Sequence, residues 1–296
     1  DMGAIDAQQR ATAVFPVVVE DPQIVEQNVG DPSNGAIRRQ VLAELAASGI
    51  DEQMLNTRGL KIITTIDRKT QEAVLAGVRS NMTGESPDLR TAGGSIDPRT
   101  GGVIGYYGGD EAEGWDYANA PLQTGSVFKI FGVAAALEQG IGLGTTISSA
   151  PVTSGNVTIT NVGGQSCGSC SISQALKMSL NTPFIRLQDQ LENKANDTAE
   201  MAHRVGIAKN IPGLPWETLT EEGGDPYDGI ILGQYPVRVR DVASALATFA
   251  DEGEFHQSHF IERVETSDGE VLLDNSNPPG EQVVEEDVAN NLTSAM

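Results

Sequence analysis

Apolar residues recur along residues 126–139 at the spacing of an amphipathic helix, and Gly140 follows as a stop signal. The apolar positions of this segment are Val127, Phe128, Ile130, Phe131, Val133, Ala134 and Leu137. The same spacing predicts further helices over residues 36–48, 68–82, 172–180, 183–192, 195–206 and 238–252.

Short β-branched runs between turn residues predict strands. One strand is expected over residues 59–67, and another near residues 157–160 within a stretch rich in Thr, Ser and Gly. Residues 92–96 and 102–107 flank Asp97-Pro98-Arg99-Thr100-Gly101, which is typical of a hairpin turn. Residues 260–273, with Gly269 at the turn, predict a final hairpin.

Composition narrows the class of protein. A chain of 296 residues with 39% hydrophobic residues can bury a substantial core. No apolar run reaches the length of a membrane span, and no signal sequence opens the chain. The net charge of -22 argues against nucleic acid and anionic membrane surfaces as partners.

The two cysteines, Cys167 and Cys170, lie in a loop rich in Gly and Ser. Two thiolates cannot complete a tetrahedral zinc site, and no histidine or second cysteine pair accompanies them. We expect a small structural disulfide in an exported protein, with a redox pair as the second possibility.

Ser126-Val127-Phe128-Lys129 is the only Ser-x-x-Lys among the six lysines of the chain. On a helix the i and i+3 side chains share a face, so the Lys129 amine is expected to reach the Ser126 hydroxyl. A serine becomes a good nucleophile when a neighbouring base takes its proton, and burial can leave a lysine neutral for that task. The start of a helix also favours negative charge developing on the serine oxygen.

Several segments together resemble the transpeptidase domain of class A high-molecular-weight penicillin-binding proteins, faintly of an actinobacterial type. LQTGSVFKIF (122–131) is similar to the nucleophile segment, and ALKMSLNTPF (175–184) to the second motif, Ser-x-Asn. GLKIITTIDRKTQEAV (59–74) and SIDPRTGGVIGYYGG (95–109) resemble the segments before the nucleophile. The resemblance implies an α/β fold of the serine β-lactamase and D,D-transpeptidase type, with an antiparallel sheet flanked by helices and an all-helical subdomain.

The resemblance also implies residue roles. Ser126 is expected to attack the D-Ala-D-Ala bond of peptidoglycan stem peptides, and β-lactam antibiotics to acylate the same serine. Lys129 is expected to act as the base, Ser179 to relay a proton, and Asn181 to hold the substrate amide. A D,D-carboxypeptidase side activity is possible. No metal or organic cofactor is expected.

Two parts of the family pattern are missing from the sequence. The third motif, Lys-Thr/Ser-Gly, does not occur, since Arg99-Thr100-Gly101 precedes Ser126. We expect that motif, and the strands that complete the sheet, on a C-terminal fragment of the same protein. Residues 57–296 are predicted as the transpeptidase domain and residues 1–56 as a linker region. The second missing part is the N-terminal membrane anchor and glycosyltransferase domain of the family. We therefore expect an extracytoplasmic location, with the membrane anchor in the full-length protein and no glycan polymerisation by this chain.

Three other functions are compatible with parts of the sequence. One is a penicillin-recognising sensor or scaffold module without turnover. Another is a serine β-lactamase. Its Glu-x-x-Leu-Asn motif is matched by Glu52-Gln53-Met54-Leu55-Asn56, but this segment lies upstream of Ser126, whereas the motif lies downstream of the nucleophile. A Ser-His-Asp hydrolase fits less well, because the chain has no Gly-x-Ser-x-Gly elbow.

Overall fold

The computed structural model of this chain describes residues 31–296, and residues 33–296 are one structural unit. This unit begins before residue 57, so helices α2 (Asn34–Ala47) and α3 (Glu52–Thr57) fold together with the segment predicted as the transpeptidase domain. The rest of the predicted linker, residues 1–30, lies outside the described residues. No helix within residues 31–296 is long and apolar enough to span a membrane.

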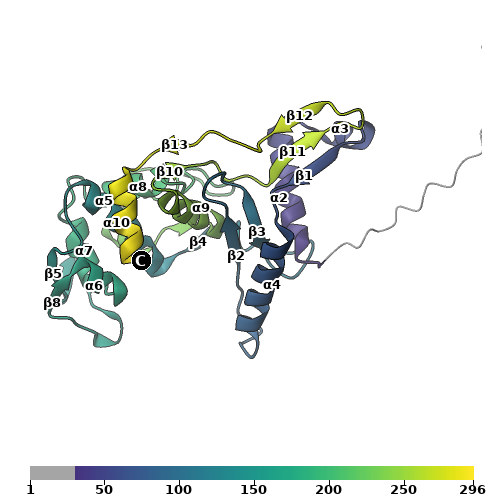
Figure 1. Cartoon of the computed structure of the whole chain (residues 1–296). Coiled ribbons are helices and arrows are strands. Elements are labelled where there is room, and N and C mark those ends of the chain that lie inside the picture. Colours follow the sequence, from purple (N-terminus) through teal and green to yellow (C-terminus); the bar gives the residue numbers. More distant parts are fainter. Residues whose placement is uncertain (1–30) are drawn as a thin grey trace, which may run out of the picture. The chain divides into compact units, whose positions relative to one another are not determined.

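A three-stranded antiparallel sheet anchors one end of this unit (Figure 1). Its order is β1 (Lys61–Thr64), β11 (Ile261–Glu265), β12 (Val271–Asp274). One face of α2 buries Ile37, Val41 and Leu45 in the apolar cluster that also contains Phe260 and Val264. The helix pattern of α2 and the β-branched run of β1 therefore meet in one core.

The hairpin β2 (Gly93–Ile96) and β3 (Val103–Tyr107) lies between two helices. Helix α4 (Arg68–Met82), which begins at the N-cap Asp67, packs against β3, and α9 (Val239–Ala250) packs against β2. The side chain of Gln71 ties α4 to the sheet, because it hydrogen-bonds both the N–H and the carbonyl of Tyr106 at 2.7 and 2.8 Å.

The second apolar cluster is mostly helical. Helix α5 (Lys129–Glu138) is buried along nearly its whole length, and α7 (Thr182–Gln188), α8 (Ala195–Arg204) and α10 (Glu286–Ala295) pack against it. Short elements complete this region: η1 (Gly125–Phe128), η2 (Val162–Gly164), α6 (Ile172–Lys177) and η3 (Asp228–Leu232). Its core includes Phe128, Phe131, Phe184, Met201 and Phe249.

Five pairs of short strands brace these helices, and all are antiparallel. Besides β2–β3, the pairs are β4 (Leu122–Gln123) with β9 (Pro236–Val237), β5 (Thr146–Ser148) with β8 (Ser169–Ser171), β6 (Val152–Ser154) with β7 (Val157–Ile159), and β10 (Glu254–Phe255) with β13 (Glu281–Gln282). The region expected to be all-helical therefore contains two of these pairs, β5–β8 and β6–β7. Two-residue strands carry no periodic signal, which explains why the sequence pattern missed most of them.

Most predicted helices and hairpins are present, and the differences lie at their ends. The helix expected from Ser126 begins with the tighter turn η1 and becomes α-helical at Lys129. The helix expected over residues 172–180 ends at Lys177, because Ser179 takes a left-handed conformation with φ of 52°. The helix expected over residues 183–192 ends at Gln188, and i→i+3 turn bonds at Gln190 and Leu191 follow.

Candidate active site

Ser126 and Lys129 lie one helical turn apart where the nucleophile helix begins. The Lys129 Nζ lies 3.0 Å from the Ser126 Oγ. Gly125, just before the serine, has φ of 61°, a conformation that glycine adopts without strain. The first turn of a helix leaves its N–H groups without helical acceptors, so they are available to a developing oxyanion near Ser126.

Lys129 is fully buried, and its amine is surrounded by neutral oxygen atoms. Besides Ser126, its Nζ lies 2.7 Å from the carbonyl oxygen of Ser179, 3.3 Å from the Ser179 Oγ and 3.1 Å from the Asn181 Oδ1. The ring of Phe184 closes another side, with its centroid 5.4 Å from the amine. Within the described residues Lys129 has no carboxylate partner.

Burial lowers the pKa of Lys129 from 10.5 to about 8. The cause is the loss of water around the amine, which disfavours the charged form when no opposite charge compensates. A lysine with a pKa near 8 has a substantial neutral population close to neutral pH. A neutral amine carries the lone pair that a general base requires.

The four acceptors around the amine also determine where that lone pair points. A carbonyl and an amide oxygen can only accept, so Ser179 O and Asn181 Oδ1 take the two N–H groups of a neutral Lys129. The lone pair is then left for a hydroxyl, and the Ser126 Oγ at 3.0 Å is nearer than the Ser179 Oγ at 3.3 Å. This arrangement directs the basic nitrogen at the Ser126 proton.

Ser179 and Asn181 reach Lys129 from the connection between α6 and α7. The left-handed backbone at Ser179 turns the chain, and hydrogen bonds from Ser179 N to Leu176 O and from Leu180 N to Ala175 O close that turn. Asn181 directly precedes α7 and directs its Oδ1 to the lysine. The four residues named from the sequence, Ser126, Lys129, Ser179 and Asn181, thus lie in one hydrogen-bonded group.

Asn161 supports this group, although no motif or periodic pattern in the sequence marks it. Its buried Oδ1 accepts from the N–H of Asn181 at 2.8 Å and from the N–H of Thr182 at 3.0 Å. Its Nδ2 donates to the carbonyls of Ser149 at 3.0 Å and Gln165 at 2.9 Å. A single amide therefore fixes the backbone at Asn181 against a distant loop, and only the folded chain brings these parts together.

The turn that carries Ser126 also packs against η3. The Gly125 N–H donates to the carbonyl of Gly233 at 3.3 Å. A Cβ at Gly233 would lie 2.1 Å from the Gly125 carbonyl oxygen, so the two backbones approach as closely as glycines permit. This contact fixes the turn that carries Ser126 against the end of η3.

A disulfide joins Cys167 and Cys170 in the loop before β8. The Cys167 N–H donates to the Ser149 Oγ at 3.0 Å, and Ser149 also accepts from Asn161 through its carbonyl. The cystine therefore braces the same loop that holds Asn161.

Other sequence candidates lie away from this group. The second Ser-x-Asn, residues 154–156, forms the turn between β6 and β7, and Ser154 hydrogen-bonds Asp228. His203 is inside α8, where its Nδ1 contacts the carbonyl of Ile207 at 2.9 Å. Arg99-Thr100-Gly101 is the turn of the β2–β3 hairpin, as expected.

Comparison with known proteins agrees with this geometry. Residues 95–296 match the family described as the penicillin-binding protein transpeptidase domain. The chain is 49% identical over 300 residues to penicillin-binding protein 1A of Mycolicibacterium smegmatis, which covers 100% of this chain and 38% of that protein. It is 47% identical over 298 residues to penicillin-binding protein 1A of Mycobacterium tuberculosis, covering 99% of this chain and 36% of that protein. The chain thus spans little more than a third of these relatives.

Solved structures of penicillin-binding proteins also match this chain. The PonA1 protein from Mycobacterium tuberculosis in complex with penicillin V superposes with a TM-score of 0.86 at 50% identity, covering 90% of this chain and 70% of that chain. Penicillin-binding protein A from Mycobacterium tuberculosis, as an imipenem acyl-enzyme complex, shares the fold with a TM-score of 0.68 at 19% identity, covering 89% and 70% of the two chains. The predicted α/β penicillin-binding fold and the actinobacterial resemblance are both confirmed. This chain belongs to the transpeptidase-domain family of penicillin-binding proteins.

Proposed function

We propose that this chain carries the acylation machinery of a serine-type peptidoglycan D,D-transpeptidase. The observation that carries the proposal is the buried Lys129 amine, 3.0 Å from the Ser126 Oγ and surrounded by neutral acceptors. Family membership supports the reaction type.

In the acylation half-reaction, neutral Lys129 takes the proton of Ser126 while the serine oxygen attacks the carbonyl carbon of the penultimate D-alanine. An ester bond forms, and the peptide bond to the terminal D-alanine breaks. The departing amine needs a proton, which Ser179 relays from Lys129 across the 3.3 Å between its Oγ and the lysine Nζ. Asn181 aligns the peptide through its side-chain amide.

In the second half-reaction, an amine of a neighbouring stem peptide attacks the ester carbonyl. A new peptide bond forms, the ester bond breaks, and the proton lost by the amine returns through Lys129 to the Ser126 oxygen. Water in place of the amine gives the D,D-carboxypeptidase side reaction. A β-lactam acylates Ser126 in the same way, except that its leaving nitrogen stays tethered in the opened ring.

We further propose that a segment carrying the Lys-Thr/Ser-Gly motif pairs with the free edge of β2. Within the described residues β2 has a strand partner only in β3. Beside that edge lies an apolar groove of about 510 Å³, and Val127, next to the nucleophile, lines it with Leu122 and Leu246. Exposed strand edges and apolar grooves are typical docking sites for an added strand.

The location that we propose for this function is extracytoplasmic, with a membrane anchor elsewhere in the full-length protein. Peptidoglycan lies outside the cytoplasm, and the Cys167–Cys170 disulfide is compatible with an oxidising compartment.

Intact-mass spectrometry after incubation with benzylpenicillin tests the proposal. The chain is assayed alone and together with a segment bearing the Lys-Thr/Ser-Gly strand, and any adduct is mapped by peptide analysis. We expect a lasting adduct on Ser126, formed faster with the segment and abolished by Ser126→Ala. No adduct in either sample would favour a sensor or scaffold module, and an adduct that is lost within seconds would favour a β-lactamase.

A further inference from the structure

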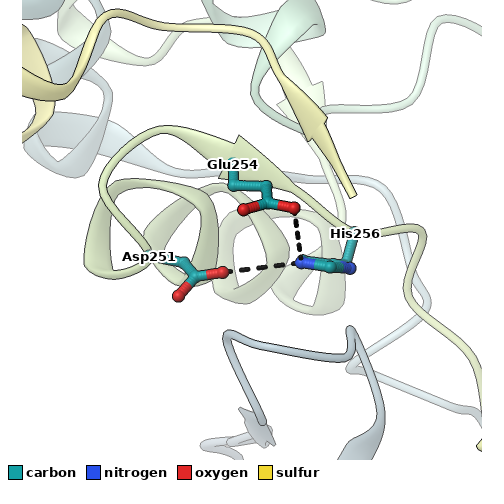
Figure 2. Close-up of side chains that lie close together, drawn as sticks. All are labelled: Asp251, Glu254 and His256. Atoms are coloured by element: carbon teal, nitrogen blue, oxygen red, sulfur yellow. Dashed lines mark ion pairs between the residues drawn. The ribbon is translucent and has the colours of Figure 1, made fainter. Parts of the chain in front are cut away.

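Three side chains outside the catalytic group converge where α9 ends (Figure 2). Asp251 directly follows α9, Glu254 begins β10, and His256 follows β10. One potential ligand atom from each of the three lies within 4.8 Å of the others. From this geometry we propose that Asp251, Glu254 and His256 bind a divalent transition-metal ion of the zinc class.

The distances from His256 to the two carboxylates are longer than hydrogen bonds and match the spacing of ligands around a shared ion. His256 Nε2 lies 3.5 Å from Asp251 Oδ2 and 3.6 Å from Glu254 Oε1. An N–H···O hydrogen bond is shorter, about 2.7–3.2 Å. Two ligand atoms that are each about 2.0–2.1 Å from a tetrahedral zinc ion lie roughly 3.4 Å apart. The observed separations are close to that value.

His256 is buried, and only one of its two ring nitrogens faces the carboxylates. Its residue is only 8% exposed, and its Nδ1 has no hydrogen-bond partner among the described residues. Its Nε2 is directed between the two carboxylates, as Figure 2 shows. A cation bound there would take the Nε2 lone pair and neutralise the two nearby negative charges, while Nδ1, on the other side of the ring, takes no part in the site.

The backbone around the three ligands is held before any ion binds. Gln282 donates from its Nε2 to the carbonyls of Glu252 at 2.9 Å and Val284 at 2.7 Å, and this links the ligand loop to β13. Gly253 has φ of 90°, and a Cβ there would lie 2.2 Å from the Val284 carbonyl oxygen. These contacts restrict the loop to one conformation, which lowers the cost of ordering a metal site.

Gly280 leaves the space that the Glu254 carboxylate occupies. A Cβ at Gly280 would lie 2.0 Å from the Glu254 Oε1 and 2.6 Å from its Cδ. The absence of a side chain at this position is what lets the carboxylate lie in the cluster. A larger residue at Gly280 should therefore displace the Glu254 carboxylate while all three ligand residues stay unchanged.

The donor set selects the kind of ion. One imidazole nitrogen with two carboxylate oxygens suits zinc and related ions, whereas calcium and magnesium prefer oxygen ligands alone. Water would complete the coordination, because Glu254 is partly exposed. All three ligands come from residues 251–256, so an ion at this point would fix the turn between α9 and β10, the strand that pairs with β13.

Isothermal titration of the full 296-residue chain with zinc chloride, after removal of metals with EDTA, tests this site. We expect one saturable equivalent of zinc and at least tenfold weaker binding of calcium. Glu254→Gln and Gly280→Ala should each weaken zinc binding at least tenfold, and zinc should raise Tm in the unmodified chain but not in Glu254→Gln. Both variants change partly exposed positions, and circular dichroism checks that they fold.

Glu262→Gln is the matched control, because it removes the same charge from an exposed position of β11. It should bind zinc like the unmodified chain. The proposal is overturned if zinc does not bind saturably, or if Glu254→Gln binds zinc as tightly as the control. Since none of these residues contacts Ser126 or Lys129, the outcome does not depend on the catalytic proposal.

Discussion

Lys129 at the start of α5 and Arg238 directly before α9 are both buried cationic side chains, and their surroundings are opposite in kind. At α9, Arg238 forms two hydrogen bonds with Asp241, from Nε to Oδ2 and from Nη2 to Oδ1, both at 2.8 Å. At α5, Lys129 meets hydroxyl, carbonyl and amide oxygens and no carboxylate. Both are at least nine-tenths buried.

The difference in surroundings determines whether each buried cation stays charged. A buried arginine with a bidentate carboxylate stays charged and fixes local geometry. A buried lysine without a counter-charge loses part of its charge, and burial lowers the pKa of Lys129 to about 8. The first arrangement holds local structure, and the second gives Lys129 the lowered pKa that its proposed role as a base requires.

The largest expected effect comes from giving α5 a cation that cannot become neutral. Lys129→Arg keeps the positive charge but has no usable lone pair, because arginine remains protonated in proteins. We expect the rate of benzylpenicillin acylation to fall about 10²–10⁴-fold, the range of general-base contributions. Lys69→Arg, an exposed change on α4, is the matched control and should react normally. Comparable acylation by both variants would show that Lys129 is not the base.

Removing the counter-charge at α9 should affect stability rather than chemistry. Asp241→Asn leaves Arg238 buried without an opposite charge, which costs about 3–5 kcal/mol of unfolding free energy. Urea denaturation measures this loss. The double variant Arg238→Met/Asp241→Leu should recover only part of it. A well-packed apolar pair often replaces a buried ion pair at little cost, but Arg240, whose Nε lies 3.7 Å from the Asp241 Oδ1, also loses its carboxylate. A single variant as stable as the unmodified chain would mean that the pair is not desolvated.

A smaller effect is expected from the residue that holds the lysine's acceptors in place. Asn161→Ala removes the support for Asn181 and leaves its N–H unpaired, which costs about 1–3 kcal/mol. Acylation should slow about 10–100-fold on the same free-energy scale. Asn156→Ala, in the exposed turn between β6 and β7, should have no effect. If both changes were equally harmless, Asn161 would have no positioning role.

The smallest effect, counted per pH unit, is a graded response of acylation to pH. Because the pKa of Lys129 is lowered to about 8, its basic form grows as pH rises toward that value. The acylation rate should therefore increase about tenfold per pH unit below pH 8 and level off above it. Stopped-flow measurement with a chromogenic β-lactam gives this profile. A rate that falls as pH rises from 6 to 8 would contradict a basic Lys129.

The sequence predicted the catalytic group better than its surroundings. Ser126 and Lys129 are three residues apart on a strongly periodic helix, so local geometry alone brings them together. Ser179 and Asn181 were named from a motif resemblance, and the fold places both beside Lys129. Local rules explain the first pair, whereas the second pair depends on tertiary structure.

Asn161 and the Gly233 contact were missed, because their partners are distant in sequence. An isolated asparagine in a Thr/Ser/Gly-rich stretch is typical of a turn, and nothing local indicates a buried amide that joins two loops. The helix ends at Lys177 and Gln188 were also misplaced, since apolar periodicity continues past the residues where the backbone turns away. Tertiary packing of loops determines both the contacts of Asn161 and Gly233 and the residues at which these helices end.

The most direct test of the central claim is a titration of the lysines by NMR. The six lysines are labelled with ¹³C at Cε, and a Lys129→Met variant identifies the signal of Lys129. We expect the Lys129 signal to titrate with a pKa near 8. A Lys129 signal that titrates near 10.4, the value of an unperturbed lysine, would contradict the claim that the fold prepares a neutral base for Ser126.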